Sequence, residues 1–191
     1  MQAYLKSTDI IDWKHPLVLE QALELSNNLD NPIEIAKSCF EWVRDEIYHS
    51  SDFQMNPVTL KASEVLENKT GFCYAKSHLL AAFLRANRIP SGLCYQRLSI
   101  DENGSPFFLH GLTAVFLPIG WYRIDPRGNK EDINAQFDPP AEHLAFTVKF
   151  KGEADLPEIW PEPLSIIVRT LSIHKKYEDI LNNLPDIPLI L

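Results

Sequence analysis

Residues 71–86 read GFCYAKSHLLAAFLRA, and this stretch decides how the rest of the chain is interpreted. Apolar residues recur along it at helical spacing, and they leave few polar positions, which is typical of a helix buried on most sides. The pattern therefore predicts a central helix over 73–86. This helix ends before Ile89-Pro90, because the residue that precedes a proline is disfavoured in helical conformation.

Three further helices are predicted upstream. Pro16 can open the first, since proline suits the first turn of a helix, and apolar residues follow it at helical spacing. Asn31 can cap the second, with Pro32 in its first turn and an apolar stripe from Ala36 to Ile47. A short third helix is predicted over 61–67.

Downstream of Pro90 the apolar residues alternate with a period of two, which indicates strands. Strands are predicted over 93–100, 107–117 and 121–125. Asn103-Gly104, a favoured type I′ hairpin turn, joins the first two, and a tight turn at Pro118-Ile119 joins the second and third. Consecutive strands joined by short turns make an antiparallel meander.

The last third of the chain completes an α+β fold. Alternating apolar residues predict a fourth strand over 144–150, and a final helix over about 164–181 is expected to pack back on the body. Helices segregated from an antiparallel sheet define the α+β class. With 191 residues, and ~100 to 200 residues in a usual domain, we expect a single domain over residues 1–191.

Composition and charge exclude several kinds of partner. The formal net charge of −8 argues against nucleic acid, because phosphate binding requires clustered Lys and Arg. The N-terminal sequence MQAYLKSTDIIDW has no signal-peptide pattern and no stretch is long and apolar enough to span a bilayer, so we expect a cytoplasmic protein with no membrane partner. The histidines, cysteines and glycines show no metal-binding or phosphate-binding spacing, so no cofactor is expected.

Cys73 is the candidate nucleophile. It lies directly after a glycine-containing turn at the start of the central helix, where free backbone N–H groups and the helix dipole stabilise a thiolate. The alternative is that Cys73 is a small buried apolar residue, since free cysteine is among the most buried residue types. Cys39 falls in a helix stripe and Cys94 in a strand, so both are interpreted as packing residues.

His110 and Asp125 are the candidate partners of this thiol. If the turn consists only of Pro118 and Ile119, Leu117 pairs with Gly120, and the two residue numbers in every pair add up to 237. Asp125 then lies opposite Leu112. His110 and Asp125 then point to the same face as diagonal neighbours, about 7 to 8 Å apart in the backbone, within reach of an imidazole and a carboxylate. A three-residue turn places them on opposite faces.

These three residues form a possible Cys-His-Asp triad of nucleophile, general acid/base and orienting carboxylate. Spacing alone leaves open that Cys73, His110 and Asp125 are three unrelated structural residues. The nearer His78 is a poor candidate base, because five residues along a helix turn it about 140° away from the cysteine at ~3.6 residues per turn. Arg127 is a candidate, with Tyr74 and Trp121, for the mouth of the site. The run RGNK at 127–130 is either a basic lip for a carboxylate or a solvated loop, and the loop is the favoured interpretation.

The order of these motifs is similar to that of a known family. GFCY at 71–74, Ile89-Pro90, His110 at a strand start and WYRIDP at 121–126 resemble the core of the transglutaminase-like superfamily, as found in bacterial putative cysteine proteases. FEWVRDEIY at 40–48 also resembles the helix that precedes the cysteine in that family. The resemblance covers about residues 30–126, and it implies a papain-like, transglutaminase-core fold with the nucleophile at the start of a central helix.

The resemblance also implies roles for individual residues. The family's catalytic cysteine, histidine and aspartate fall on Cys73, His110 and Asp125, and Tyr74 and Trp121 are expected to border the substrate or the oxyanion. Members often carry tryptophan where this chain has Tyr74. A tyrosine can also line an acyl site.

The implied activity is acyl transfer from an amide bond of a peptide or protein substrate through a thioester. Hydrolysis, as by a protease or amidase, is the favoured outcome. Two alternatives stay open: a protein-glutamine gamma-glutamyltransferase that cross-links proteins, and a binding module that keeps the fold without turnover. Arylamine acetyltransferases and peptide glycanases share the order Cys, His, Asp, so the sequence leaves the acceptor open.

Overall fold

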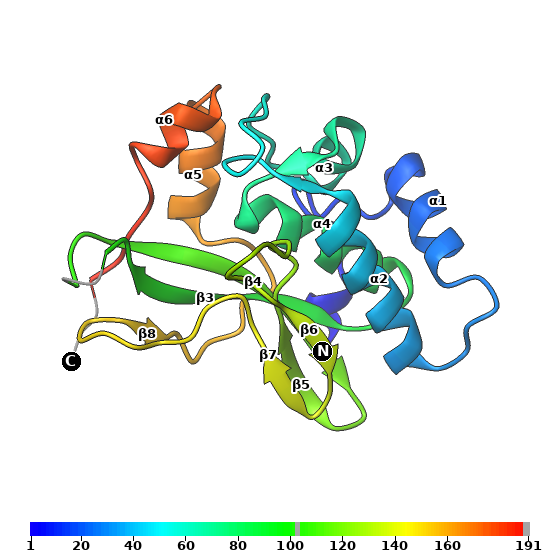
Figure 1. Cartoon of the computed structure of the whole chain (residues 1–191). Helices are drawn as coiled ribbons and strands as arrows, with labels where there is room; N and C mark the ends of the chain where they lie inside the picture. The colour runs from blue at the N-terminus through cyan, green and yellow to red at the C-terminus, as the bar shows by residue number, and fades with distance from the viewer. Residues whose placement is uncertain (102–103, 189–191) are drawn as a thin grey trace.

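A computed structural model describes residues 1–101 and 104–188 of the chain (Figure 1). The helices are η1 (Gln2–Leu5), α1 (Pro16–Leu25), α2 (Pro32–Glu46), α3 (Ala62–Asn68), α4 (Cys73–Ala86), α5 (Ser165–Ile173) and α6 (Tyr177–Leu181). The strands are β1 (Tyr48–His49), β2 (Thr70–Gly71), β3 (Ser91–Ser99), β4 (Phe107–Leu117), β5 (Gly120–Ile124), β6 (Gln136–Asp138), β7 (Ala141–His143) and β8 (Ala154–Asp155). Helices α1 to α4 lie together on one side of an antiparallel sheet, so the α+β prediction is confirmed.

Helix α4 is the centre of the fold and has the bounds that the sequence predicts. Every residue from Cys73 to Arg85 is buried, because α1, α2 and α3 contact α4 on one side and β3 and β4 contact it on the other. Its polar side chains find backbone partners instead of water. His78, for example, donates from Nδ1 to the carbonyl of Leu60 at 2.8 Å, in keeping with a structural role for this histidine.

Arg85 is the largest of these buried polar side chains, and it is 1% exposed. Its guanidinium donates to the carbonyl of Ser91 at 2.9 and 3.1 Å, to that of Lys6 at 2.9 Å and to that of Pro161 at 2.6 Å. Five N–H donors in a rigid fork suit this task. One side chain of the central helix therefore holds three segments that are far apart in the sequence.

The second helix starts as its sequence predicts. The Asn31 side chain accepts a hydrogen bond from the backbone N–H of Ile33 at 2.9 Å, and Pro32 occupies the first helical position. Ala36, Cys39, Phe40 and Val43 are fully buried along one face. Cys39 is thus a packing residue, as expected from its place in the apolar stripe.

The main sheet has the strand order β5-β4-β3-β8 among the described residues. Strands β3, β4 and β5 form the predicted antiparallel meander, and Leu117 pairs with Gly120 across a two-residue turn. This is the expected register, in which the residue numbers of each pair in β4 and β5 add up to 237. The expected approach of His110 to Asp125 depends on it. The predicted turn at Asn103-Gly104 lies partly outside the described residues.

The predicted strand over 144–150 is wrong. This segment is a loop whose backbone N–H groups donate to carboxylates: Ala145 to Asp125 at 3.0 Å, and Lys149 and Phe150 to Glu153 at 2.7 and 2.9 Å. The edge of β3 is occupied by β8 instead. The apolar residues that alternate in the sequence are not alternately buried, since Val148 and Phe150 are exposed. A loop is possible here because side-chain oxygens satisfy its backbone donors.

The predicted final helix over 164–181 is interrupted. Helix α5 ends at Ile173 because His174 adopts an extended conformation, and α6 restarts at Tyr177. The backbone N–H of Tyr177 donates to the side-chain oxygen of Asn56 at 2.8 Å. This contact from a distant segment fixes the start of α6, which brings the following residues over the sheet.

Candidate active site

His110 and Asp125 meet on one face of the sheet, at the place where β5 ends. The two side chains are joined by a hydrogen bond of 2.7 Å between His110 Nε2 and Asp125 Oδ2. They are 1% and 0% exposed, respectively, so the interaction takes place away from bulk water. The two-residue turn between β4 and β5 produces this approach, because it sets the register of the strands.

Cys73 lies beside this pair, as the first residue of α4. Its Sγ accepts a hydrogen bond from the backbone N–H of Gly111 at 3.5 Å, which places the sulfur next to the strand position that follows His110. Nε2 of His110 is bonded to Asp125, so Nδ1 is the ring nitrogen that remains for the sulfur. The structure therefore brings together the three residues that the sequence singles out.

The electrostatics of the pair favour an imidazolium. Burial disfavours the charged form of the His110 ring. This effect is outweighed by the charges of Asp125 and Cys73 and by hydrogen bonds from the ring to both residues, so the pKa of His110 is raised to about 10. Burial also disfavours an ionised Asp125, but the charge of His110 and the hydrogen bonds lower its pKa. Besides the bond from His110, the Asp125 carboxylate accepts hydrogen bonds from the backbone N–H of Arg127 at 3.1 Å and from that of Ala145 at 3.0 Å.

The sulfur and the imidazole face a small cavity of about 160 Å³. The ring of Phe146 stands perpendicular to that of His110 at 4.9 Å and shields it. The cavity is mostly apolar and is lined by His49, Ser51, Phe72, Cys73, Tyr74, Phe108, His110, Arg127, Phe146, Leu181 and Leu184. Cys73 is only 6% exposed, so the site is nearly closed.

Tyr74 and Trp121 have different places in the structure. Tyr74 lines the cavity, and its hydroxyl donates to the carbonyl of Leu109, which fixes the ring against β4. Trp121 lies at the other end of β5, where it packs on Tyr4 and Phe116 with ring centroids 4.9 and 5.4 Å away. Trp121 is not among the residues that line the cavity, which corrects the expectation that it borders the site. The cause is its position next to the β4–β5 turn, four residues from Asp125.

Arg127 lies at the cavity, as one interpretation of the sequence has it, and the favoured interpretation of 127–130 as a solvated loop is wrong for this residue. Its side chain is buried and lines the cavity, and it pairs with both oxygens of Asp52 at 2.6 and 3.1 Å. Burial opposes the ionisation of Asp52, but hydrogen bonds from Arg127 and Lys130 lower its pKa to about 2. The pair joins the loop after Asp125 to the segment after β1.

His49 is a cavity residue that the sequence does not single out. Its ring packs edge-on against Phe72 at 5.6 Å, and its Nδ1 is hydrogen bonded to Ser51 at 2.9 Å. Burial and the charge of Arg127 hold its pKa well below the usual range, so the ring is neutral. His49 reaches the site through the parallel pairing of β1 with β2, and strands of two residues leave no periodic signal in a sequence.

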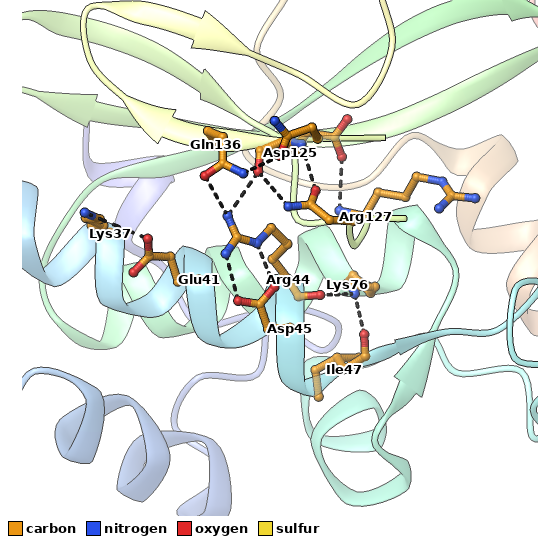
Figure 2. A network of polar contacts seen from close by, with 12 residues as sticks. Lys37, Glu41, Arg44, Asp45, Ile47, Lys76, Asp125, Arg127 and Gln136 are labelled. Atoms are coloured by element: carbon orange, nitrogen blue, oxygen red, sulfur yellow. Dashed lines mark hydrogen bonds and ion pairs between the residues drawn. The ribbon is translucent and has the colours of Figure 1, made fainter. Parts of the chain in front are cut away.

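A polar network behind the site holds the loop that carries Arg127 (Figure 2). Lys76, one turn along α4 from Cys73, donates from Nζ to the carbonyls of Arg44 and Ile47 at the end of α2. Arg44 in turn donates to the carbonyl of Ala135 at 3.0 Å. Burial and the nearby charge of Arg127 lower the pKa of Lys76 to about 7.

Two further properties concern the part of the chain that the structure describes. No group of three or more His, Cys, Asp or Glu side chains is arranged there to hold a metal ion. No helix among these residues is long and apolar enough to cross a membrane.

Known proteins share both the sequence pattern and the fold of this chain. The model of the transglutaminase-like superfamily matches residues 20–126. A putative cysteine protease from Cytophaga hutchinsonii superposes with a TM-score of 0.54 at 16% identity, over 65% of this chain and 40% of that one. The periplasmic domain of TgpA from Pseudomonas aeruginosa gives a TM-score of 0.46 at 20% identity, over 58% and 42%. No curated protein matches the sequence.

The chain thus spans about two fifths of the length of these solved structures. The likeness to the Cytophaga hutchinsonii protein confirms the expected fold, in which helices pack on an antiparallel sheet in the transglutaminase-like, papain-like arrangement.

Proposed function

Since the chain belongs to the transglutaminase-like superfamily, we propose that it is a cysteine-dependent enzyme that cleaves amide bonds through Cys73, His110 and Asp125. The observation that carries this proposal is the 2.7 Å hydrogen bond between buried His110 and Asp125, with the sulfur of Cys73 beside them at a helix start. A thiol at a helix start next to a buried His–Asp pair supports these roles, because acyl transfer requires a nucleophile, a base and an orienting group close together.

In the first half of the reaction, the thiolate of Cys73 attacks the carbonyl carbon of the amide. Backbone N–H groups at the start of α4 face the developing oxyanion, and the helix dipole stabilises its charge. The carbon–nitrogen bond then breaks as the imidazolium of His110 gives its proton to the departing amine. The products of this step are a free amine and a thioester on Cys73.

In the second half, the neutral His110 takes a proton from a water molecule, which attacks the thioester. The carbon–sulfur bond breaks with its electron pair on sulfur, so the carboxylic acid leaves and Cys73 is again a thiolate. The proton taken from water returns the imidazole of His110 to its charged form beside Asp125. We favour water as the acceptor because the cavity of about 160 Å³ and the 6% exposure of Cys73 admit small molecules more readily than a protein side chain.

The first test is chemical modification of the thiol without a substrate. A short pulse of iodoacetamide at pH 6 is followed by peptide mapping with mass spectrometry. We expect rapid labelling at Cys73 that His110→Ala slows at least about tenfold, because the cation beside the sulfur is removed. Cys39→Ala, which removes a buried thiol elsewhere, is the matched control and should leave labelling at Cys73 unchanged. Equal labelling in the wild type and His110→Ala contradicts the proposed pair.

The second test separates the possible acceptors. A glutamine-containing peptide is incubated with the protein, with and without methylamine, and ammonia, peptide fragments and amine incorporation are measured. Peptide fragments or ammonia without amine support hydrolysis, and they should be absent with Cys73→Ala. Incorporation of methylamine in place of hydrolysis identifies a cross-linking activity, and a rapidly labelled protein that turns over no amide identifies a binding module.

A further inference from the structure

A second cleft lies next to the cavity at Cys73, on the face of the sheet that carries the His110 side chain. In the pairing of β3 with β4, Gln96 lies opposite His110 and Leu98 lies opposite Phe108. Because alternate residues of a strand point to the same face, the Leu98–Phe108 pair is the next row along from His110, about 7 Å away at ~3.4 Å per residue. Leu98 and Phe108 are part of the lining of a cleft of about 410 Å³.

Loops complete the lining of this cleft. Leu144, Phe146 and Phe150, from the segment that follows β7, add apolar side chains. Asp132 and Asn134, from the segment that precedes β6, add polar groups. The cleft thus combines an apolar row of the sheet, an apolar loop and a polar part.

The cleft is already formed in the protein, because a carboxylate fastens its loop to the sheet. Glu153, which accepts the backbone N–H groups of Lys149 and Phe150, also accepts that of Ser99 at the end of β3 at 2.8 Å. The volume of about 410 Å³ falls within the range of ~300 to 1,000 Å³ that is usual for ligand sites. The cavity at Cys73, at about 160 Å³, is too small to hold more than the reacting group of a substrate.

Two aromatic residues belong to both spaces. Phe108 and Phe146 line the cavity at Cys73 as well as the cleft. Both are half-buried, so part of each residue is open to a ligand. The ring of Phe146 also stands against the imidazole of His110, with ring centroids 4.9 Å apart. The cleft therefore begins on the side of the cavity where the imidazole lies.

The proposed reaction places the amine half of the substrate on this same side. In that reaction His110 gives its proton to the departing amine, so the amine nitrogen lies within hydrogen-bond reach of the imidazole. The acyl half is bonded to the sulfur of Cys73 at the start of α4. A group attached to the amine nitrogen can then extend past the imidazole to Phe146 and into the cleft.

We propose that this cleft binds the amine half of the substrate and selects amines that carry an aromatic or large aliphatic side chain. The inference rests on the proposed function for the direction of the reaction. Leu98 and Phe108 on the sheet and Phe146 on the loop provide the apolar surface that buries such a side chain. Burial of one large apolar side chain corresponds to about tenfold or more in affinity.

Competition between two amines for an acyl enzyme tests this selectivity in the full-length chain. The thiolate of Cys73 attacks p-nitrophenyl acetate, and p-nitrophenolate leaves. An added amine then attacks the thioester and gives a proton to His110, and the carbon–sulfur bond breaks with its electron pair on sulfur. Incoming and departing amines pass through the same transition state, so they use the same site.

Phenylalaninamide and glycinamide are the two competing amines. Their N-acetyl products are measured by mass spectrometry and corrected for the reactivity of each amine towards a small thioester in solution. We expect the protein to use phenylalaninamide about tenfold or more in preference to glycinamide. Equal use of the two amines overturns the inference.

Two adjacent positions of the loop provide matched variants. Thr147 is exposed and lines the cleft, whereas Val148 is exposed and is not among the residues that line it. Thr147→Trp fills part of the cleft and should reduce the preference for phenylalaninamide to about twofold or less, with the rate for glycinamide unchanged. Val148→Trp should keep the wild-type preference. Loss of the preference in both variants, or in neither, contradicts the cleft as the amine site.

A binding measurement without turnover separates this inference from the proposed function. Saturation-transfer NMR detects phenylalaninamide bound to the Cys73→Ala protein, and adding Thr147→Trp, but not Val148→Trp, should weaken the signal. Such binding without any acetylation of Cys73 in the wild type supports the cleft and contradicts the amidase. Acetylation that requires His110 but shows no preference between the amines supports the reactive pair and contradicts the inference. Absence of both binding and acetylation contradicts both.

Discussion

Replacing Asp125 by asparagine tests whether a buried carboxylate keeps His110 charged. At 2.7 Å the two charges interact by about 6 kcal/mol at an effective dielectric constant of ~20. One pKa unit corresponds to about 1.4 kcal/mol, so this attraction equals about four units. Together with the charge of Cys73 and the hydrogen bonds of the ring to Asp125 and Cys73, this attraction outweighs burial and holds the pKa of His110 at about 10. The asparagine side chain is similar in size to the aspartate it replaces but carries no charge.

In Asp125→Asn the burial of His110 remains while its counter-charge is gone, so its pKa falls towards or below the usual value of ~6.5. The wild type should then be labelled by iodoacetamide at a rate that changes little between pH 6 and pH 9, because the cation beside Cys73 persists. In the variant, labelling at pH 6 should fall at least about tenfold and then rise steeply with pH. The rate is measured at half-unit pH intervals by mass spectrometry of the intact protein.

Stability provides a second readout of the same substitution. The folded pKa of His110 lies above its unfolded value, so the stability that its charge contributes is fully present below about pH 6.5 and is lost as the pH rises through about 10. Urea unfolding should show this decline in the wild type relative to Asp125→Asn. Asp138→Asn, at an exposed carboxylate, is the control. A flat labelling profile shared by the wild type and Asp125→Asn refutes the reasoning.

Three further predictions concern the surroundings of the site. Gly111→Ala places a Cβ 2.8 Å from the ring of Tyr74, so it should move the start of α4 away from β4. We expect urea unfolding to show a loss of stability of about 1 to 3 kcal/mol. Mass spectrometry should show slower labelling of Cys73. The pKa of Lys76 is about 7 in the folded protein and ~10.4 in the unfolded chain. The wild type should therefore gain stability relative to Lys76→Met as the pH rises from 7 to 10. In urea unfolding the gain should be at most about 1.4 kcal/mol per pH unit. Burial raises the pKa of Cys39 to about 12 and raises that of Cys94 further, so neither thiol should be labelled in the native protein at pH 8, and labelling of both should appear only in denaturant.

The elements that the sequence predicts well are those whose signals are local. Helix α4 has a long run of helical spacing, a glycine-containing turn before it and a proline after it, and its bounds match the prediction. The approach of His110 to Asp125 follows from the length of one turn, because a two-residue turn sets the register of the strands that carry them.

The elements that the sequence predicts poorly depend on distant contacts. Residues 144–150 alternate like a strand, but Asp125 and Glu153 satisfy their backbone donors. Arg127 is buried because Asp52, on a separate loop, neutralises it, and no local pattern marks such a pair. His49 reaches the cavity through two-residue strands, which are shorter than any periodic signal.

The guanidinium of Arg85 has a consequence for how much of the chain is needed to fold. The family match starts at residue 20 and ends at residue 126, but two of the three carbonyls that Arg85 binds belong to Lys6 and Pro161. A fragment cut to the matched residues loses two of the three carbonyls that bind Arg85, together with the segments around Lys6 and Pro161 that lie against this end of α4. We therefore propose that residues 1–161 at least form one cooperative unit, so that a proteolytic cut that removes Lys6 or Pro161 should unfold the whole unit in a single step.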